Sequence, residues 1–290
     1  MLARSTQTNE PGRCAALLPV LAGLPEPLAL LEVGASAGLC LFPDFYAYDY
    51  GGPLLGPAAG RNAPPVFPCA VNAATPLPAR LPRIVWRAGL DLNPVDLADP
   101  GEVAWLEALI WPEETDRLAR LRAAIAIAAV QKPRLVKGDL GTDLAALARE
   151  APKGATLVIF HTAVLAYISS AAEREEFARS VGSLCDFWIA NEAPQVFPGI
   201  AGRAGRGGAE RQLPVVRERL SGGLDRSAWR IGRLDHRAAE PVTARRKGPF
   251  SFASGTDRSH NGAAAQTQTE EQRWTAARSA TSSASASASR

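Results

Sequence analysis

The chain has 290 residues, of which 47% are hydrophobic, and its net charge at pH 7 is +3. This apolar content can build a substantial core, and no apolar run approaches the ~18 residues that a membrane span needs. The first ten residues also lack the apolar stretch of a secretory signal, so we expect a cytoplasmic protein with no membrane association.

The charge is distributed unevenly along the chain. Residues 1–198 contain 16 Lys and Arg against 21 Asp and Glu, whereas residues 199–290 contain 16 against 8. The second part is rich in Arg, Gly, Ala and Ser, without apolar periodicity, and cannot bury enough surface to offset chain ordering. We therefore predict a disordered, basic, low-complexity tail over 199–290. Its scattered arginines argue against nucleic-acid binding.

The N-terminal part predicts a short helix, a buried strand and a glycine loop. Residues 14–24 form an apolar segment that predicts a helix, so 1–27 is expected to be a helical remnant before the main domain. The continuous apolar run 28–33 is typical of a central parallel strand covered on both faces. A helix is expected to start at 39–42 and to end or kink at Pro43.

Residues 51–82 hold too many prolines and glycines for regular elements and predict an insertion. Next to it, the alternating Tyr46, Tyr48 and Tyr50 are expected to pack on one face of an extended hairpin with 66–67.

Strands and helices then alternate to residue 192. Further strands are predicted at 83–90, 135–136, 155–160 and 187–190, and helices at 99–110, from 112, at 142–149 and at 173–183. Asp99 is the expected N-cap of the first of these helices, with Pro100 at its first position. This alternation predicts a Rossmann-like α/β domain over 28–198, with a mostly parallel sheet and helices on both faces.

The glycine loop is the strongest functional signal. It reads E-V-G-A-S-A-G, with Glu32, Gly34, Ser36 and Gly38 at alternate positions between a strand and a helix. Gly34 permits a tight turn, Gly38 lets the helix approach the strand, and the helix N-terminus would offer free N–H groups to a ligand. We therefore predict a nucleotide-type ligand at this loop.

The loop resembles motif I of class I S-adenosylmethionine-dependent methyltransferases, which implies S-adenosylmethionine as cofactor. The resemblance implies that Glu32 lies near the methionine moiety, that Asp91 accepts hydrogen bonds from ribose hydroxyls, and that Asp139 lies near the adenine amine. Asp91 follows Glu32 by 59 residues, an interval lengthened by the 51–82 insertion, and Asp49 is the alternative ribose carboxylate.

His161 is the candidate general base, because it ends a central strand and imidazole titrates near neutral pH. The alternative is a buried histidine with a structural role. Asn191 and Glu192, at the end of the last strand, are either part of the site wall or ordinary loop residues.

The same loop also reads G-x-S-x-G, the nucleophile-elbow pattern of serine hydrolases, with Ser36 as the nucleophile. Too few residues precede it, and no H-G-G-G oxyanion loop is present, so this alternative is weaker. The cysteines and histidines do not have the spacing of a metal site.

Several motifs in order resemble the bacterial family known as domain of unknown function 2332. They are T-Q-T-N-E-P-G-R-C-A-A-L-L-P at 6–19, L-L-E-V-G-A-S-A-G-L at 30–39, Y-A-Y-D-Y-G at 46–51, G-L-D-L-N-P-V-D at 89–96, L-I-W-P-E-E-T-D-R-L at 109–118, F-H-T-A-V-L-A-Y at 160–167 and N-E-A-P at 191–194. The resemblance covers 6–198 and implies a methyltransferase-like fold. Cys40 stands where asparagine is expected. We expect a member shortened at its N-terminus, with a tail after 198 that arises from a shifted reading frame.

The leading hypothesis is a methyltransferase-like enzyme that acts on an unidentified small molecule. A non-catalytic nucleotide- or metabolite-binding protein of the same fold and the Ser36 hydrolase are the alternatives. The oligomeric state is not indicated by the sequence.

Overall fold

The structure is a computed structural model that describes Gln7, 9–58, 63–71, 75–192 and Val196, and the backbone of Pro214–Arg219 and Ala228–Arg230. By its internal contacts the chain divides into two units, Met1–Glu240 and Pro241–Arg290, and all described residues belong to the first. The account below concerns that unit alone.

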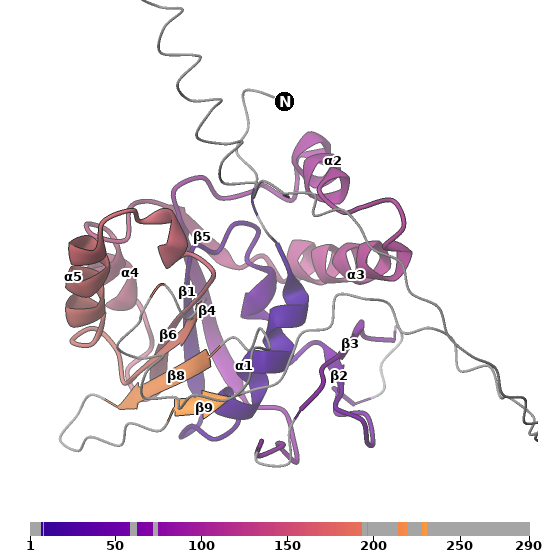
Figure 1. The fold of residues 1–290 in the computed structure, drawn as a ribbon, viewed down its shortest axis with the longest axis horizontal. Helices are drawn as coiled ribbons and strands as arrows, with labels where there is room; N and C mark the ends of the chain where they lie inside the picture. The colour runs from indigo at the N-terminus through magenta and orange to yellow at the C-terminus, as the bar shows by residue number, and fades with distance from the viewer. Residues whose placement is uncertain are drawn as a thin grey trace, which may run out of the picture. The chain divides into compact units, whose positions relative to one another are not determined.

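A seven-stranded sheet forms the centre of the unit, in the order β5-β4-β1-β6-β7-β8-β9 (Figure 1). The strands are β1 (Leu28–Val33), β4 (Ile84–Asp91), β5 (Arg134–Lys137), β6 (Thr156–Thr162), β7 (Phe187–Asn191), β8 (Pro214–Arg219) and β9 (Ala228–Arg230). The first five are all parallel, and the order reverses between β1 and β6. The predicted Rossmann-like α/β fold is confirmed.

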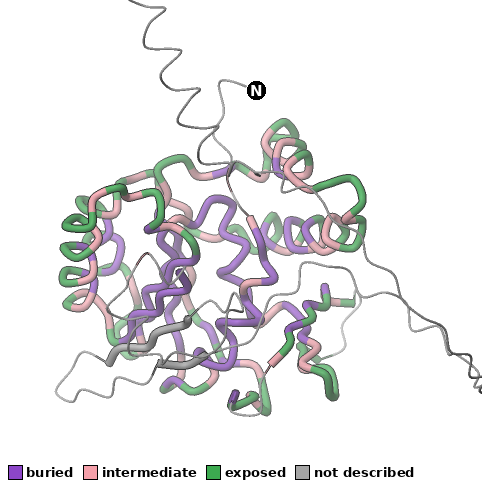
Figure 2. The backbone as a smooth tube through the Cα atoms, in the orientation of Figure 1, coloured by how far each residue is buried: buried purple, intermediate pink, exposed green. Residues whose placement is uncertain are grey.

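Helices cover both faces of the sheet. The helical elements are η1 (Pro11–Arg13), α1 (Cys14–Leu21), η2 (Leu39–Leu41), α2 (Pro100–Ala108), α3 (Thr115–Gln131), α4 (Leu144–Ala148), η3 (Leu165–Tyr167) and α5 (Ala171–Val181). One core packs α1 and α3 against the sheet, and the other packs α4 and α5 against the opposite face. Strand β1 serves both cores, because its side chains alternate between the two faces. Figure 2 shows the buried residues gathered in these central strands and in α1.

The N-cap prediction for α2 is confirmed. The Asp99 carboxylate accepts a hydrogen bond from Gly101 N at 2.7 Å, and Pro100 is the first residue of the helix. The next helix starts at Thr115 rather than at Pro112, because a turn at 112–113 and an N-cap at Glu114 precede it.

The aromatic segment forms a two-stranded sheet of its own. Strands β2 (Ala47–Asp49) and β3 (Val66–Pro68) pair in parallel, so the expected hairpin is wrong. Parallel strands need a connection that leads from the end of the first strand back to the level of its start, and the long segment between β2 and β3 can provide it, whereas a short hairpin turn joins only antiparallel strands. Tyr46 and Tyr48 are fully buried, and their hydroxyls donate to backbone carbonyls at 2.7 and 2.6 Å, which confirms the packing role.

Two strands lie within 199–290, where the sequence predicts disorder. Strand β8 pairs antiparallel with β7, and β9 pairs antiparallel with β8. The expectation of an entirely irregular tail does not hold for these strands. Without β8, the edge of β7 would present unpaired backbone groups, and the β-branched pair Val215-Val216 suits a strand that covers this edge. The other residues of the expected tail lie outside the described part of the chain.

Candidate functional site

The carboxyl ends of the parallel strands surround a cavity of about 650 Å³. It lies where the strand order reverses, which is the position at which open α/β sheets bind their ligands. Its lining residues are Gln7, Arg13, Val33, Gly34, Ser36, Leu90, Asp91, Leu92, Asn93, Gly138, Asp139, Leu140, Gly141, Thr162, Ala163, Val164, Tyr167, Ile168, Glu173, Glu176, Phe177 and Ser180. The volume is within the ~300–1,000 Å³ range of small-molecule sites.

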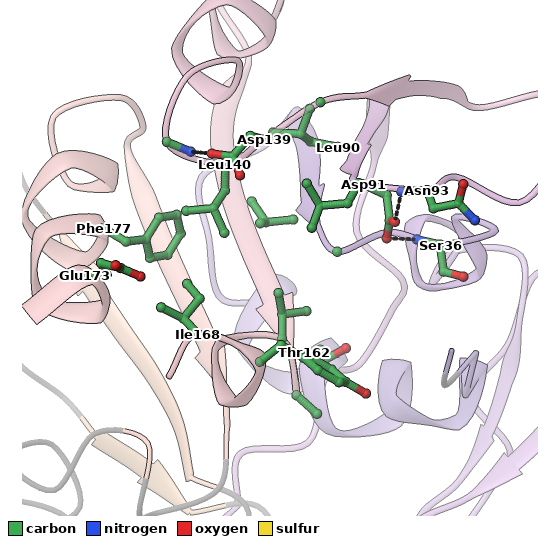
Figure 3. A pocket seen from close by; sticks show the side chains of 18 of the residues that line it. Ser36, Leu90, Asp91, Asn93, Asp139, Leu140, Thr162, Ile168, Glu173 and Phe177 are labelled. Carbon is green, nitrogen blue, oxygen red and sulfur yellow. Dashed lines mark hydrogen bonds between the residues drawn. The ribbon is translucent and has the colours of Figure 1, made fainter. Parts of the chain in front are cut away.

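Two walls of the cavity face each other. In Figure 3, Asp91 and Ser36 lie at one side, and Glu173 and Phe177 of α5 lie at the other. Apolar side chains, such as Leu140, Ile168 and Phe177, line the cavity together with the polar Asp91, Ser36 and Glu173. The cavity is therefore mainly apolar with a few polar groups at its walls, the usual composition of a small-molecule site.

The charged side chains of the lining are mostly acidic. Asp91, Asp139, Glu173 and Glu176 contribute carboxylates, and Arg13 is the one Lys or Arg among the lining residues. Glu176 forms an ion pair with Arg179, which does not line the cavity. The electrostatic potential in the cavity therefore favours a ligand with cationic groups or hydroxyl donors over one that carries phosphate.

Asp91 joins the end of β4 to the glycine loop. Its Oδ2 accepts a hydrogen bond from Ser36 N at 2.7 Å, and its Oδ1 accepts one from Asn93 N at 2.8 Å. Each oxygen of a carboxylate has two lone pairs, so both can accept a further bond from a ligand. Asp91 thus holds the loop and faces the cavity at the same time.

Asp139 follows β5 and is exposed at the neighbouring wall. Its Oδ1 accepts a hydrogen bond from Gly141 N at 2.7 Å, while no described residue donates to Oδ2. The rival residue Asp49 makes the same kind of turn, with Gly51 N at 2.8 Å from its Oδ1, but it lies on β2 and does not line the cavity.

Every backbone N–H of the glycine loop 34–38 already donates to an acceptor within the protein. Gly34 and Ala35 donate to Leu90 O at 2.8 and 3.3 Å. The other three bonds are Ser36 N to Asp91 Oδ2 at 2.7 Å, Ala37 N to Asn9 Oδ1 at 3.1 Å and Gly38 N to Ala35 O at 2.6 Å. The loop leads into the three-residue η2 rather than an α-helix. The expectation of free helix N-terminal N–H groups at this loop is therefore wrong.

Steric reasons explain both loop glycines. Gly34 has a φ of +71°, and a Cβ at this position would lie 2.3 Å from Cγ2 of Val164. Gly38 has a φ of +70°, and its Cβ would lie 3.0 Å from Leu135 of β5. Gly34 thus allows the β6–α5 loop to pack against the turn, and Gly38 allows the chain to pass close to β5.

The Ser36 side chain is buried and engaged. Its hydroxyl donates to Gln7 Oε1 at 2.8 Å and accepts from Asn9 Nδ2 at 2.7 Å. No described hydrogen bond joins Ser36 to His161 or to any other base. The geometry therefore gives no support to Ser36 as a nucleophile.

The N-terminal segment is a part of the site that the sequence analysis missed. Gln7 and Arg13 line the cavity, and Gln7 Nε2 also donates to Asn93 O at 2.8 Å. The T-Q-T-N-E motif was the available signal, because its amide side chains suit the capping of a nearby turn. The α5 residues were missed as well, because an exposed helix face gives no such signal.

Glu32 does not reach the cavity. It precedes the last residue of β1 and faces the core that contains α1, where it is only 3% exposed. Burial raises the pKa of its carboxyl well above the usual value, the nearby Cys40 and Asp91 raise it further, and Arg13 opposes the rise. No described residue is a hydrogen-bond partner of its Oε2.

His161 is fully buried and is not part of the cavity lining. Its Nε2 accepts a hydrogen bond from Trp188 Nε1 at 3.0 Å, so the proton of a neutral ring is on Nδ1, which lies 2.6 Å from Glu192 Oε1. Both ring nitrogens are therefore engaged, and the geometry favours the structural alternative over the general base.

Glu192 connects β7 to the loop after β6. Its Oε1 accepts hydrogen bonds from Val164 N at 2.8 Å and Leu165 N at 3.1 Å in addition to His161. Burial alone would raise the pKa of Glu192, but these hydrogen bonds and the nearby imidazole outweigh it and lower the pKa. Glu192 thus fixes the loop whose Val164 packs on Gly34. Its neighbour Asn191 is 1% exposed, and within the part of the chain that the structure describes its side-chain amide has no hydrogen-bond partner.

Within the described part of the chain, no group of three or more His, Cys, Asp or Glu could hold a metal ion. Within the same residues, no helix is both long and apolar enough to cross a membrane. All four cysteines are free thiols.

Comparison with known proteins identifies one family. The family described as "Uncharacterized protein conserved in bacteria (DUF2332)" matches residues 1–239. The match extends past residue 198, so the family-like region is longer than the sequence analysis expected, and a change of reading frame directly after 198 is not supported. No curated protein and no solved structure matches significantly. The chain belongs to the DUF2332 family.

Proposed function

We propose that the cavity binds an adenosyl ligand without phosphate, S-adenosylmethionine, and that the protein is a methyltransferase-like enzyme acting on a small molecule. The observation that carries the proposal is the position of Asp91 and Asp139. These carboxylates end adjacent strands and line one cavity together with the Gly34 turn.

The residues present fit this ligand. The carboxylate of Asp91 offers acceptors to a ribose diol, and the free Oδ2 of Asp139 offers one to an adenine amine. S-adenosylmethionine supplies an electrophilic methyl group on a sulfonium, whose positive charge suits the acidic lining. The apolar wall formed by Leu140, Ile168 and Phe177 would exclude water from the reacting groups.

Phosphate-bearing ligands fit less well. A turn that binds pyrophosphate needs free backbone N–H groups, and those of residues 34–38 all have protein acceptors. Asp91, Asp139, Glu173 and Glu176 would repel a phosphate held beside them. NAD and ATP are therefore the appropriate negative controls.

Methyl transfer depends mainly on the alignment of donor and acceptor, so a cavity without a free imidazole can perform it. A second candidate is a non-catalytic binding protein, which is favoured by the full engagement of His161 with Glu192 and Trp188. Formation of S-adenosylhomocysteine when the protein is incubated with candidate acceptors would separate the two candidates.

Titration calorimetry with S-adenosylmethionine, S-adenosylhomocysteine, NAD and ATP tests the proposal. We expect binding of the first two alone. Asp139→Asn removes a charged acceptor and should weaken binding about 10-fold or more. Asp49→Asn is the matched control, because both residues form the same turn with a glycine two positions later. Tighter binding of NAD or ATP, or equal affinity of both variants, would contradict the proposal.

A further inference from the structure

Three buried polar residues at the strand ends lie on the face of the sheet that α1 covers. Each of them stands two positions after a core residue of the same strand. Glu32 continues the series Leu28 and Leu30 of β1. Thr162 continues the series Val158 and Phe160 of β6, and Asn191 continues Phe187 and Ile189 of β7. The apolar residues of each series belong to the core beneath α1. Because side chains alternate along a strand, Glu32, Thr162 and Asn191 share that face.

Arg13 connects these residues to the cavity. Its Nη1 donates to Thr162 O at 2.8 Å and to Thr162 Oγ1 at 3.0 Å. Thr162 pairs with Asn191 across β6 and β7, and Glu32 is close enough to Arg13 for the guanidinium to affect its titration. Arg13 and Thr162 also line the cavity, so the group is continuous with it.

The unused hydrogen-bonding atoms of this group are unusual for a protein interior. Glu32 and Asn191 are 3% and 1% exposed, yet among the described residues none is a hydrogen-bond partner of Glu32 Oε2 or of either polar atom of the Asn191 amide. The large majority of buried side-chain polar atoms in folded proteins have a hydrogen-bond partner. An unpaired buried polar group costs about 1–3 kcal/mol. The unpaired atoms of Glu32 and Asn191 flank the Arg13–Thr162 contact, and we take them as a sign of a missing partner.

We propose that Arg13, Thr162, Asn191 and Glu32 form a second binding site that holds the carboxylate of a small organic acid. Arg13 provides the positive charge, and no described residue accepts a hydrogen bond from its Nε or Nη2. No described residue accepts a hydrogen bond from Asn191 Nδ2, so this amide offers a further donor. Since Thr162 Oγ1 accepts from Arg13, the Thr162 hydroxyl proton is free to donate as well.

The raised pKa of Glu32 agrees with an anionic occupant. Burial raises the pKa of this carboxyl above its usual value, which favours the neutral form that can donate a hydrogen bond. The site then presents four donors and one net positive charge, which is the complement of a carboxylate. This proposal does not depend on the adenosyl ligand, although the organic acid is a natural candidate for the methyl acceptor.

The test measures the melting temperature of the full chain with sodium succinate or benzoate, at constant ionic strength and without S-adenosylmethionine. Succinamide and benzamide are the neutral controls. We expect a concentration-dependent rise with the two carboxylates and none with the amides. Equal shifts with acids and amides would overturn the proposal, whatever the outcome for S-adenosylmethionine.

The variants separate this site from nonspecific binding. Arg13→Gln should abolish the shift, whereas Arg80→Gln, at an exposed ion pair with Glu26, should keep it. Glu32→Gln retains a neutral donor and should keep most of the shift. A shift in Arg13→Gln as large as that of the wild type would refute the site.

Asn191→Leu covers the case in which Arg13→Gln does not fold. It replaces an unpaired amide by an apolar side chain of similar size, so we expect a melting temperature at least equal to the wild type without acid, and no rise with acid. A large loss of stability without acid would show that the amide has a structural partner and would refute the proposal.

Discussion

At the residue scale, Gly34 carries two constraints that substitution can separate. Gly34→Ala introduces a side chain at a φ of +71° and places its Cβ against Val164. The backbone strain costs roughly 1–3 kcal/mol, and the overlap adds roughly 1–3 kcal/mol. Gly51→Ala is the control, because Gly51 has a φ of +85° but no atom within 4 Å of the added Cβ. Urea unfolding should show a larger loss for Gly34→Ala, and equal losses would mean that the Val164 contact is unimportant.

Glu192 should make the stability depend on pH in a defined direction. Its carboxyl has a lowered pKa in the folded protein, so it contributes stability above the ordinary Glu pKa of about 4.3. That contribution is lost as the pH falls through the lowered value. Glu192→Gln keeps an acceptor but loses its charge, which should cost roughly 1–2 kcal/mol at pH 7.

The measurement is urea unfolding of the wild type and Glu192→Gln at pH 7 and at pH 4. The difference between the two proteins should shrink at the lower pH, because Glu192 of the unfolded wild type then binds protons more readily than Glu192 of the folded wild type. A difference that stays constant or grows as the pH falls would contradict the assigned hydrogen bonds.

The sequence located some site residues and misplaced others for a simple geometric reason. Asp91 ends β4 and Asp139 closely follows β5. A correct prediction of where these strands end is therefore enough to place both residues at the carboxyl edge of the sheet. Glu32 and His161 lie within strands, where one residue of alternation decides the face. His161 has two hydrogen-bond partners, Trp188 of β7 and Glu192 directly after β7. Both belong to a different part of the chain, so no local sequence pattern could reveal these contacts.

At the scale of elements, the segment from Gln7 to Arg13 depends on α3 for its position. Arg117 of α3 donates to Glu10 Oε2 at 2.7 Å, and Glu10 Oε1 accepts from Gly12 N at 3.0 Å. The segment in turn holds the glycine loop through Asn9. Helix α3 therefore supports the glycine loop indirectly: Arg117 binds Glu10, and the neighbouring Asn9 binds the loop.

Arg117→Gln should loosen the glycine loop at a distance. We expect a loss of roughly 1 kcal/mol in stability and faster amide hydrogen exchange at Ala37, whose N–H is held by Asn9. Arg122→Gln breaks a more exposed ion pair with Glu107 and serves as the control. Equal exchange rates at Ala37 in both variants would show that Arg117 does not support the loop.

The element boundaries show where local sequence preferences are insufficient. The segment after Gly38 was expected to begin a helix, but η2 ends at Leu41 because Pro43 follows so soon. The pairing of β2 with β3 could not be predicted either, since its parallel direction depends on the path of the intervening chain.

At the scale of the whole molecule, the boundary of the first unit near residue 240 agrees with the end of the family match at 239. We expect a fragment of residues 1–240 to unfold cooperatively with nearly the melting temperature of the full chain. A fragment of residues 1–192 lacks β8 and β9, exposes the edge of β7 and should melt lower or aggregate. Circular dichroism of both fragments would decide this, and equal stabilities would exclude a structural role for β8 and β9.

The saturated amides of the 34–38 turn limit how this fold could change its ligand. To grip a phosphate, the turn would have to release the Ser36 amide from Asp91 and the Ala37 amide from Asn9. A substitution of Asp91 that freed the Ser36 amide would also remove the carboxylate proposed to bind the ribose diol. Recognition of a diol and recognition of a phosphate therefore compete for one side chain, and exchanging one for the other would require coordinated changes in two separate segments of the chain.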